Sequence, residues 1–216
     1  VLVGKTNMDQ FATGLVGVRS PHGVCRSVVA PSIVAGGSSS GSAVAVAAGE
    51  VVFSLGTDTA GSGRVPAQCN GIVGFKGSRG MLPSTGVVPA CRSLDCVTVF
   101  ASTVEDAALA TSVAAGPDAR DPFRRVLAPA HPPVVPGVVR VAVPRSLPAP
   151  ADDEDVAMLA AAVEALRSSL ASDGVVVDVV EVDLDPFLAA GRLLYGGSWV
   201  AERYSSVGRF IDDHPN

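Results

Sequence analysis

Two segments rich in glycine and serine contain the residues best suited to chemistry. Residues 36–42 read GGSSSGS, and residues 56–64 read GTDTAGSGR. A serine nucleophile needs a base, hydrogen-bond donors for the developing oxyanion, and a backbone that lets the substrate approach. The small residues at 59–61 remove side-chain obstruction ahead of Ser62, so their backbone N–H groups could converge on one oxygen. Ordinary turns also use glycine and serine, so composition alone does not establish catalysis.

The elements that would position these segments alternate with glycine-bearing turns. We expect helices at 43–48, from 65 onward, at 104–115 and at 152–171, and strands at 1–3, 51–55, 138–143 and from 174 to 177. Glycine-rich loops between buried elements favour an α/β architecture. The proline-rich residues 127–137 are predicted to form an excursion on the surface.

Composition and charge point to a compact protein that acts on a small molecule. The chain has 216 residues, of which 48% are hydrophobic and 17% charged, which is typical of a folded domain. Its net charge of −5, without a cluster of Lys or Arg, gives no electrostatic footprint for nucleic acid or an anionic membrane. The longest nearly apolar stretch, 43–55, falls short of the ~20 residues that span a bilayer.

The cysteines argue against a metal or redox site. None of the four forms a C-x-x-C pair, and none has a histidine nearby in the sequence. We therefore expect reduced thiols in a cytoplasmic protein, and no metal or organic cofactor.

Taken together, the two segments resemble the amidase signature family. That family shows a Gly-Gly-Ser-Ser-(Gly/Ser)-Gly run followed by Gly-Thr-Asp-x-(Gly/Ala)-Gly-Ser-x-Arg. The likeness extends to residues 4–9 (GKTNMD), 71–76 (GIVGFK), 79–80 (RG) and 86–89 (GVVP). It implies an α/β fold of the amidase-signature type, with a mixed central β-sheet flanked by helices on both faces. Residues 1–216 are then expected to be one partial domain, incomplete at both ends.

The resemblance assigns the nucleophile and its partner. Ser62 corresponds to the acylated serine, and Ser38 to a bridging serine on a cis peptide bond. In this family an unprotonated lysine acts through the bridging serine as general base. The two lysines here, Lys5 and Lys76, match other positions of the pattern. We therefore expect the catalytic lysine in a segment before residue 1, and the 216 residues alone to be inactive.

The resemblance also assigns the groups around the nucleophile. Thr59, Ala60 and Gly61 correspond to the oxyanion loop. Asp58 and Arg64 could take part in catalysis, but we favour a supporting role in which they tie this loop down through hydrogen bonds.

Two other catalytic patterns are weaker. Residues 4–6 (GKT) match the end of a phosphate-binding P-loop, but apolar residues precede them where that loop needs turn-forming ones. A Ser-His-Asp triad lacks a G-x-S-x-G elbow. It would have to recruit a histidine from a proline-flanked or proline-adjacent loop: His22, His131 or His214.

Two further stretches are similar to the allophanate hydrolases within the family. They are residues 91–96 (CRSLDC) and 194–204 (LYGGSWVAERY). The resemblance implies that Tyr195 and Arg203 hold the substrate, Arg203 offering a planar fork for a carboxylate. A separation of eight residues would place both on one face of a helix. On spacing alone, Tyr195 would be a core aromatic and Arg203 a surface cation.

The sequence therefore predicts an amidohydrolase that converts allophanate to ammonia and carbon dioxide through an acyl-enzyme. Members of this group follow a biotin-dependent urea carboxylase in urea breakdown and tend to form homodimers. Three alternatives stay open: a general signature amidase, the amidase subunit of a tRNA-dependent amidotransferase, and a noncatalytic amidase-like binding module.

Overall fold

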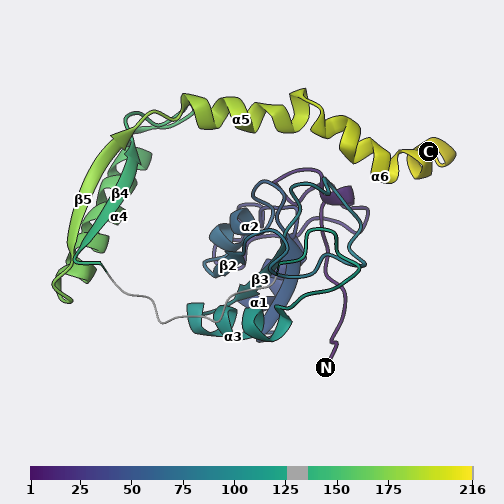
Figure 1. The fold of residues 1–216 in the computed structure, drawn as a ribbon, viewed down its shortest axis with the longest axis horizontal. Coiled ribbons are helices and arrows are strands. Elements are labelled where there is room, and N and C mark those ends of the chain that lie inside the picture. Colours follow the sequence, from purple (N-terminus) through teal and green to yellow (C-terminus); the bar gives the residue numbers. More distant parts are fainter. Residues whose placement is uncertain (126–135, 216) are drawn as a thin grey trace. The chain divides into compact units, whose positions relative to one another are not determined.

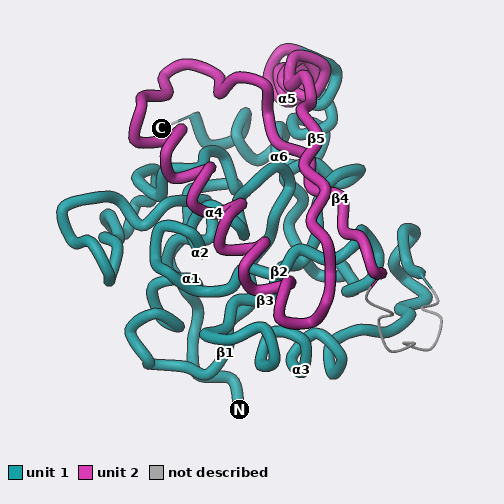
Figure 2. The backbone as a smooth tube through the Cα atoms, turned by 90° about the vertical axis from the view of Figure 1, so that its left-hand side faces the viewer, with its two compact units in different colours: residues 1–128, 197–216 teal, residues 129–196 magenta. Residues whose placement is uncertain are grey.

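The computed structural model describes residues 1–125 and 136–215, which form two compact units (Figure 1). Residues 1–128 and 197–216 make up the first unit, and residues 129–196 the second (Figure 2). Most of the proline-rich segment at 127–137 lies outside the described residues.

A three-stranded antiparallel sheet forms the centre of the first unit. The strands are β1 (Phe53–Thr57), β2 (Val73–Lys76) and β3 (Val97–Ala101), in the order β1-β3-β2. Side chains alternate between the two faces of a strand, so the central strand β3 supplies both faces with buried residues. Phe100 points to one face, and Val99 and Ala101 to the other.

Helices cover both faces of this sheet. On the Phe100 face, α1 (Ser40–Ala47) and α2 (Arg64–Cys69) contribute Ala43, Val46 and Ala67 to a buried cluster. On the opposite face, α3 (Val104–Ala114) buries Ala107 against Val99. The unit also contains the short 3-10 helix η1 (Gln10–Ala12) and the helix α6 (Trp199–Asp213). The loops that enter α1 and α2 are the two glycine- and serine-rich segments.

The second unit is a parallel β-α-β arrangement followed by a helix. Strands β4 (Val138–Pro144) and β5 (Val176–Val182) pair in parallel, and α4 (Asp153–Ala171) connects them. A capping box starts α4: the Asp152 carboxylate accepts from the backbone N–H of Asp155, and the Asp155 carboxylate accepts from that of Asp152. Helix α5 (Asp185–Gly196) follows β5.

The predicted α/β class is confirmed, and the helices and most strands form close to where the sequence placed them. The antiparallel and parallel strands expected in one mixed sheet form two separate sheets among the described residues. None of the described helices is long and apolar enough to cross a membrane.

The strand predicted at residues 1–3 is wrong. Val1, Leu2 and Val3 are exposed and belong to no strand. An apolar run becomes a strand only when its backbone N–H and C=O groups find a partner strand, and no described strand pairs with this one. The strand predicted at 51–55 exists but begins two residues later, at Phe53.

Candidate active site

Ser38 lies at the start of the loop that leads into α1. The Gly37–Ser38 peptide bond is cis, the geometry that the family resemblance implies for this serine. The side chain is fully buried, and its Oγ has no hydrogen-bond partner among the described residues. A buried hydroxyl without a partner is costly, because it has given up its bonds to water. Ser38 is therefore placed as a hydroxyl that still has a bond to make.

Asp9, which the sequence analysis did not single out, supports this loop. Its carboxylate is fully buried and accepts from the backbone N–H groups of Gly17 at 2.9 Å and Arg19 at 2.8 Å. Its own N–H donates to the Ser38 carbonyl oxygen at 2.9 Å. A Cβ atom on Gly37 would lie 2.2 Å from Asp9 Oδ2, so the close approach requires glycine. The sequence offers only the position of Asp9 in the GKTNMD match as a signal.

Ser62 lies in the turn between β1 and α2, where Asp58 organises the backbone. Ser62 is almost completely buried. The Asp58 carboxylate accepts from the backbone N–H groups of Gly61 at 2.7 Å, Gly63 at 3.1 Å and Arg64 at 3.2 Å. These bonds bend the chain around one carboxylate and fix the backbone on both sides of Ser62.

Two cations bind the same carboxylate. Arg64 donates from Nε at 3.0 Å and Nη2 at 3.1 Å, and Lys76 donates from Nζ at 3.1 Å. Burial alone would raise the pKa of Asp58, but the Arg64 hydrogen bonds, the Lys76 charge and the Gly61 N–H together hold that pKa well below its ordinary value of 3.8. Asp58 is thus a permanently ionised anchor. Lys76, which the sequence pattern left without a role, belongs to this anchor.

The oxyanion loop differs from the prediction at Gly61. The Gly61 N–H donates to Asp58, so in this conformation it is committed to the carboxylate and not to a substrate oxygen. Thr59 is fixed in two ways: its hydroxyl donates to Asp95 Oδ1 at 2.6 Å, and its carbonyl accepts from Lys76 Nζ at 3.2 Å. The backbone N–H groups of Thr59 and Ala60 remain the candidate oxyanion donors from the predicted set.

A backbone hydrogen bond joins the two serine loops. The N–H of Ser39 donates to the carbonyl oxygen of Ser62 at 3.3 Å. The Ser39 hydroxyl also bonds to the backbone of Thr57, accepting from its N–H and donating to its C=O, both at 3.2 Å. The loops containing Ser38 and Ser62 are therefore neighbours, held together through the intervening Ser39.

Tyr195 and Arg203 lie on different helices. The prediction of one helix face is wrong, because Tyr195 belongs to α5 in the second unit and Arg203 to α6 in the first. The break falls at residues 196–198 (GGS), where two consecutive glycines disfavour a continuous helix.

Arg203 lies beside the segment that borders the serine loops. Its Nη1 donates to Thr13 Oγ1 at 2.7 Å. Two residues further on, the Leu15 carbonyl accepts from the Gly37 N–H at 2.8 Å. A Cβ atom on Gly61 would lie 3.3 Å from the Leu15 side chain. Residues 13–15 thus connect the Arg203 side chain with the loops of Ser38 and Ser62.

The rival patterns find no support. Residues 4–6 precede no helix of the kind that a P-loop requires, and the Thr6 hydroxyl bonds to Ser42 Oγ at 2.8 Å. His22 is exposed in a turn, and His214 stacks on Phe210 at the end of α6. His131 lies outside the described residues. In the part of the chain that the structure describes, no three His, Cys, Asp or Glu side chains form a group that could hold a metal ion.

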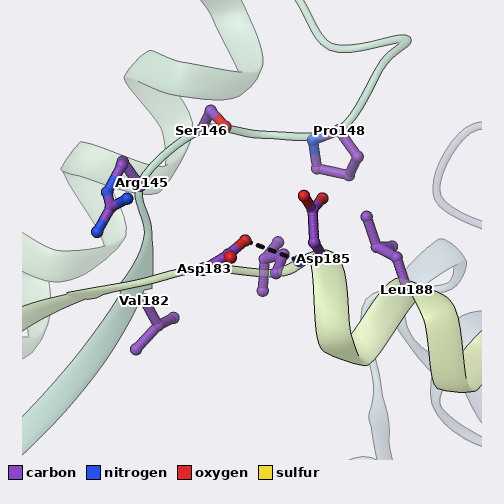
Figure 3. Close-up of a pocket in the computed structure, with 8 residues that line it drawn as sticks. Arg145, Ser146, Pro148, Val182, Asp183, Asp185 and Leu188 are labelled. Carbon is purple, nitrogen blue, oxygen red and sulfur yellow. Dashed lines mark hydrogen bonds between the residues drawn. The ribbon is translucent and has the colours of Figure 1, made fainter.

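A pocket of about 280 Å³ lies in the second unit, at the carboxyl ends of β4 and β5 (Figure 3). It is lined by Arg145, Ser146, Pro148, Val182, Asp183, Leu184, Asp185 and Leu188. The Asp183 carboxylate accepts from the backbone N–H of Asp185 at 2.9 Å, and Arg145 pairs with Glu181 at 3.7 Å. Its wall contains none of the predicted site residues. We therefore place the chemistry at the serine loops.

Comparison with known proteins agrees with this location. The sequence model of the family described as Amidase matches residues 1–214. Urea amidolyases from Lachancea kluyveri and Saccharomyces cerevisiae are 46% and 43% identical over the whole chain. The chain spans only 12% and 11% of the length of these two relatives.

Solved structures give the same picture. Kluyveromyces lactis allophanate hydrolase has a TM-score of 0.89 at 44% identity, with 100% of this chain and 34% of that chain covered. The urea amidolyase of the same yeast has a TM-score of 0.90 at 43% identity, with 100% and 13% covered. A glutamyl-tRNA(Gln) amidotransferase subunit from Thermotoga maritima is more distant, at 0.75 and 29%, with 100% and 48% covered.

Proposed function

Since the chain belongs to the amidase family, we propose that it supplies the nucleophile and the bridging serine of an enzyme that hydrolyses allophanate. The observation that carries this proposal is the pairing of the two serine loops through the Ser39 N–H and the Ser62 carbonyl. It places a buried serine that lacks a partner among the described residues next to a serine on a fixed turn. The identity to urea amidolyases and allophanate hydrolase favours allophanate among the amides.

In the proposed reaction, Ser62 Oγ attacks the terminal amide carbonyl of allophanate. The Ser62 proton passes to Ser38, and the proton of Ser38 passes to an unprotonated lysine elsewhere in the full-length protein. The proton returns to the leaving nitrogen, ammonia departs, and water then releases the acyl group from Ser62. A lysine at Ser38 Oγ would also satisfy the hydroxyl that has no partner among the described residues.

The developing negative charge on the carbonyl oxygen needs fixed donors. The N–H groups of Thr59 and Ala60 are the proposed pair, with Gly61 bound to Asp58. Donors of this kind stabilise the transition state because they are already oriented when the charge appears. Each is typically worth about 2.7 to 4 kcal/mol of activation free energy.

Allophanate carries a carboxylate, so its site needs a cation. We propose that Arg203 binds this carboxylate, since a guanidinium presents paired donors in the geometry of a carboxylate. Its contact with Thr13 places it on the segment that borders the serine loops. Tyr195 is proposed to contribute a hydroxyl to the same substrate.

The competing functions make different predictions for substrates. A general amidase, or an amidotransferase subunit like the Thermotoga maritima relative, would keep Ser38 and Ser62 but would not require a cation for a substrate carboxylate. Ammonia release by the full-length protein should be measured with allophanate, a simple aliphatic amide and glutamine. We expect allophanate to be preferred; turnover of the simple amide or glutamine alone would refute the proposal.

A noncatalytic binding module is the remaining alternative. It is distinguished by whether the full-length protein contains a lysine that reaches Ser38. A structure of that protein in which Ser38 Oγ contacts a lysine Nζ supports the enzyme, and a Ser38 surrounded only by apolar groups supports the module.

Partnership with a biotin-dependent urea carboxylase is proposed from the resemblance to urea amidolyases. Such a carboxylase would produce allophanate from urea. We also propose a homodimer, which the molar mass of the full-length protein in solution would test.

A further inference from the structure

The carboxylate of Glu202 forms an unusually complete contact with one residue of a distant loop. Its Oε1 accepts from the Ser93 N–H at 2.6 Å, and its Oε2 accepts from the Ser93 hydroxyl at 2.7 Å. These bonds lower the pKa of Glu202, so the side chain is ionised at neutral pH. Glu202 precedes Arg203 directly in the first turns of α6. The contact therefore fixes the part of the helix that presents the proposed carboxylate ligand.

The loop that receives Glu202 is itself rigid. The N–H groups of Leu94 and Asp95 both donate to the Cys91 carbonyl, at 2.9 and 2.8 Å. The Asp95 carboxylate, which is buried, accepts from the N–H groups of Ala90 at 2.9 Å and Cys91 at 3.0 Å. Arg79 donates to the Ser93 carbonyl. A turn closed on itself in this way transmits position instead of absorbing movement.

The same turn reaches the oxyanion loop. Asp95 Oδ1 accepts from the Thr59 hydroxyl at 2.6 Å, and both residues are buried. A continuous set of hydrogen bonds therefore runs from Glu202 to Ser93, through the turn to Asp95, and on to Thr59. Every member lies within the first compact unit.

We propose that Glu202 is a positioning residue that sets the distance between Arg203 and the Thr59 loop, and thereby makes the enzyme selective for amides that carry a carboxylate. This inference rests on the proposed function. One end of the substrate must meet Arg203 while its amide carbonyl lies at Ser62. Bidentate contacts tolerate little displacement, and misplacement by about 1 Å can cost ~100-fold in rate.

The test compares two substrates in the full-length protein. One is allophanate, and the other is its neutral analogue with a carboxamide in place of the carboxylate. In Glu202→Gln, amide nitrogen faces a Ser93 donor, so one bond is lost. We expect KM for allophanate to rise and kcat/KM to fall by about 10- to 100-fold, while the values for the neutral analogue change less than about threefold. Equal losses with both substrates would indicate a merely structural role and overturn the inference.

A double-variant cycle tests the same inference with allophanate alone. If Glu202 acts through Arg203, then Glu202→Gln combined with Arg203→Ala should lose no more than Arg203→Ala alone. Additive losses would overturn the inference. Glu164→Gln, in which an exposed carboxylate paired with Arg167 is neutralised, serves as the matched control and should behave as wild type.

Two outcomes separate this inference from the proposed function. A wild-type protein that hydrolyses only neutral amides refutes both. A wild-type protein that hydrolyses allophanate, with Glu202→Gln unchanged in KM and selectivity, refutes this inference alone. If Glu202→Gln does not fold, Ser93→Ala removes one of the two bonds with a smaller perturbation, and the same selectivity shift is expected.

Discussion

The backbone N–H of Ser39 donates a 3.3 Å hydrogen bond to the carbonyl oxygen of Ser62. This bond connects the residue after the buried Ser38 with the proposed nucleophile, across loops that are 24 positions apart in sequence. Each loop also has its own buried carboxylate, Asp9 for the first and Asp58 for the second. The serine pair is therefore held by backbone groups, and the two side-chain hydroxyls are left for chemistry.

Replacing the proposed nucleophile should abolish turnover. In the full-length protein, Ser62→Ala removes the atom that is acylated, and Ser38→Ala breaks the path of the proton. We expect each to lower kcat for ammonia release from allophanate by about 10⁴-fold or more, and the double variant to lose little beyond either one. Ser112→Ala, at an exposed hydroxyl of α3, is the control and should keep the wild-type rate. Wild-type turnover by Ser62→Ala would show that the mechanism is wrong.

Removing the proposed carboxylate ligand should weaken substrate capture more than chemistry. Arg203→Ala deletes a charge-assisted contact worth about 1.5 to 3 kcal/mol, so KM for allophanate should rise by roughly 10- to 150-fold while kcat changes less. Steady-state kinetics of the full-length protein measure both constants. The neutral carboxamide analogue is the control substrate, and a similar rise in its KM would contradict the assignment.

The sequence predicted the local chemistry of the site better than its three-dimensional support. Ser38, Ser62 and the Asp58 loop lie in one short pattern each, so spacing and small residues were sufficient to indicate them. Asp9 and Asp95 act on residues far from them in the chain, through backbone N–H groups or a hydroxyl, and such pairings leave no local pattern.

The errors have physical causes of the same kind. The eight-residue spacing of Tyr195 and Arg203 predicts one helix face only if the helix is continuous, and the intervening glycines end it. The availability of the Gly61 N–H depends on where the Asp58 carboxylate points, which propensity does not reveal. Residues 1–3 have strand-like composition, but pairing is a tertiary property.

Loss of the Asp58 charge should destabilise the protein strongly. Asp58→Asn leaves backbone donors and Lys76 without their buried acceptor, for which we expect a loss of about 3 kcal/mol in the free energy of unfolding. The Arg64 side chain is 56% exposed, so Arg64→Ala should cost only about 1 kcal/mol. Denaturant unfolding of the full-length protein would measure both. Equal losses in the two variants would show that Asp58 does not anchor the loop.

Stability should also depend on pH through Asp58. Because its folded-state pKa lies well below the ordinary 3.8, the folded protein binds fewer protons than the unfolded protein between these two values. The stabilisation is complete above about pH 5 and is lost as the pH falls through 3.8 toward the folded-state pKa. Urea midpoints between about pH 5 and pH 2.5 should fall with pH. The slope should be smaller in Asp58→Asn; an identical slope would assign the effect to other carboxylates.

A single methyl group at Gly37 should disrupt the bridging serine. A Cβ atom there would lie 2.2 Å from Asp9 Oδ2 and 2.5 Å from the Gly17 nitrogen, so it must break their hydrogen bond or move the Gly37–Ser38 backbone. We expect Gly37→Ala to cost about 1 to 3 kcal/mol of folding free energy and to lower kcat with it. Gly191→Ala is the matched control, since no atom lies within 4 Å of its Cβ position and alanine favours the helix. It should be neutral or slightly stabilising, and a Gly37→Ala variant equal to it in stability and rate would show that the Asp9 contact does not position Ser38.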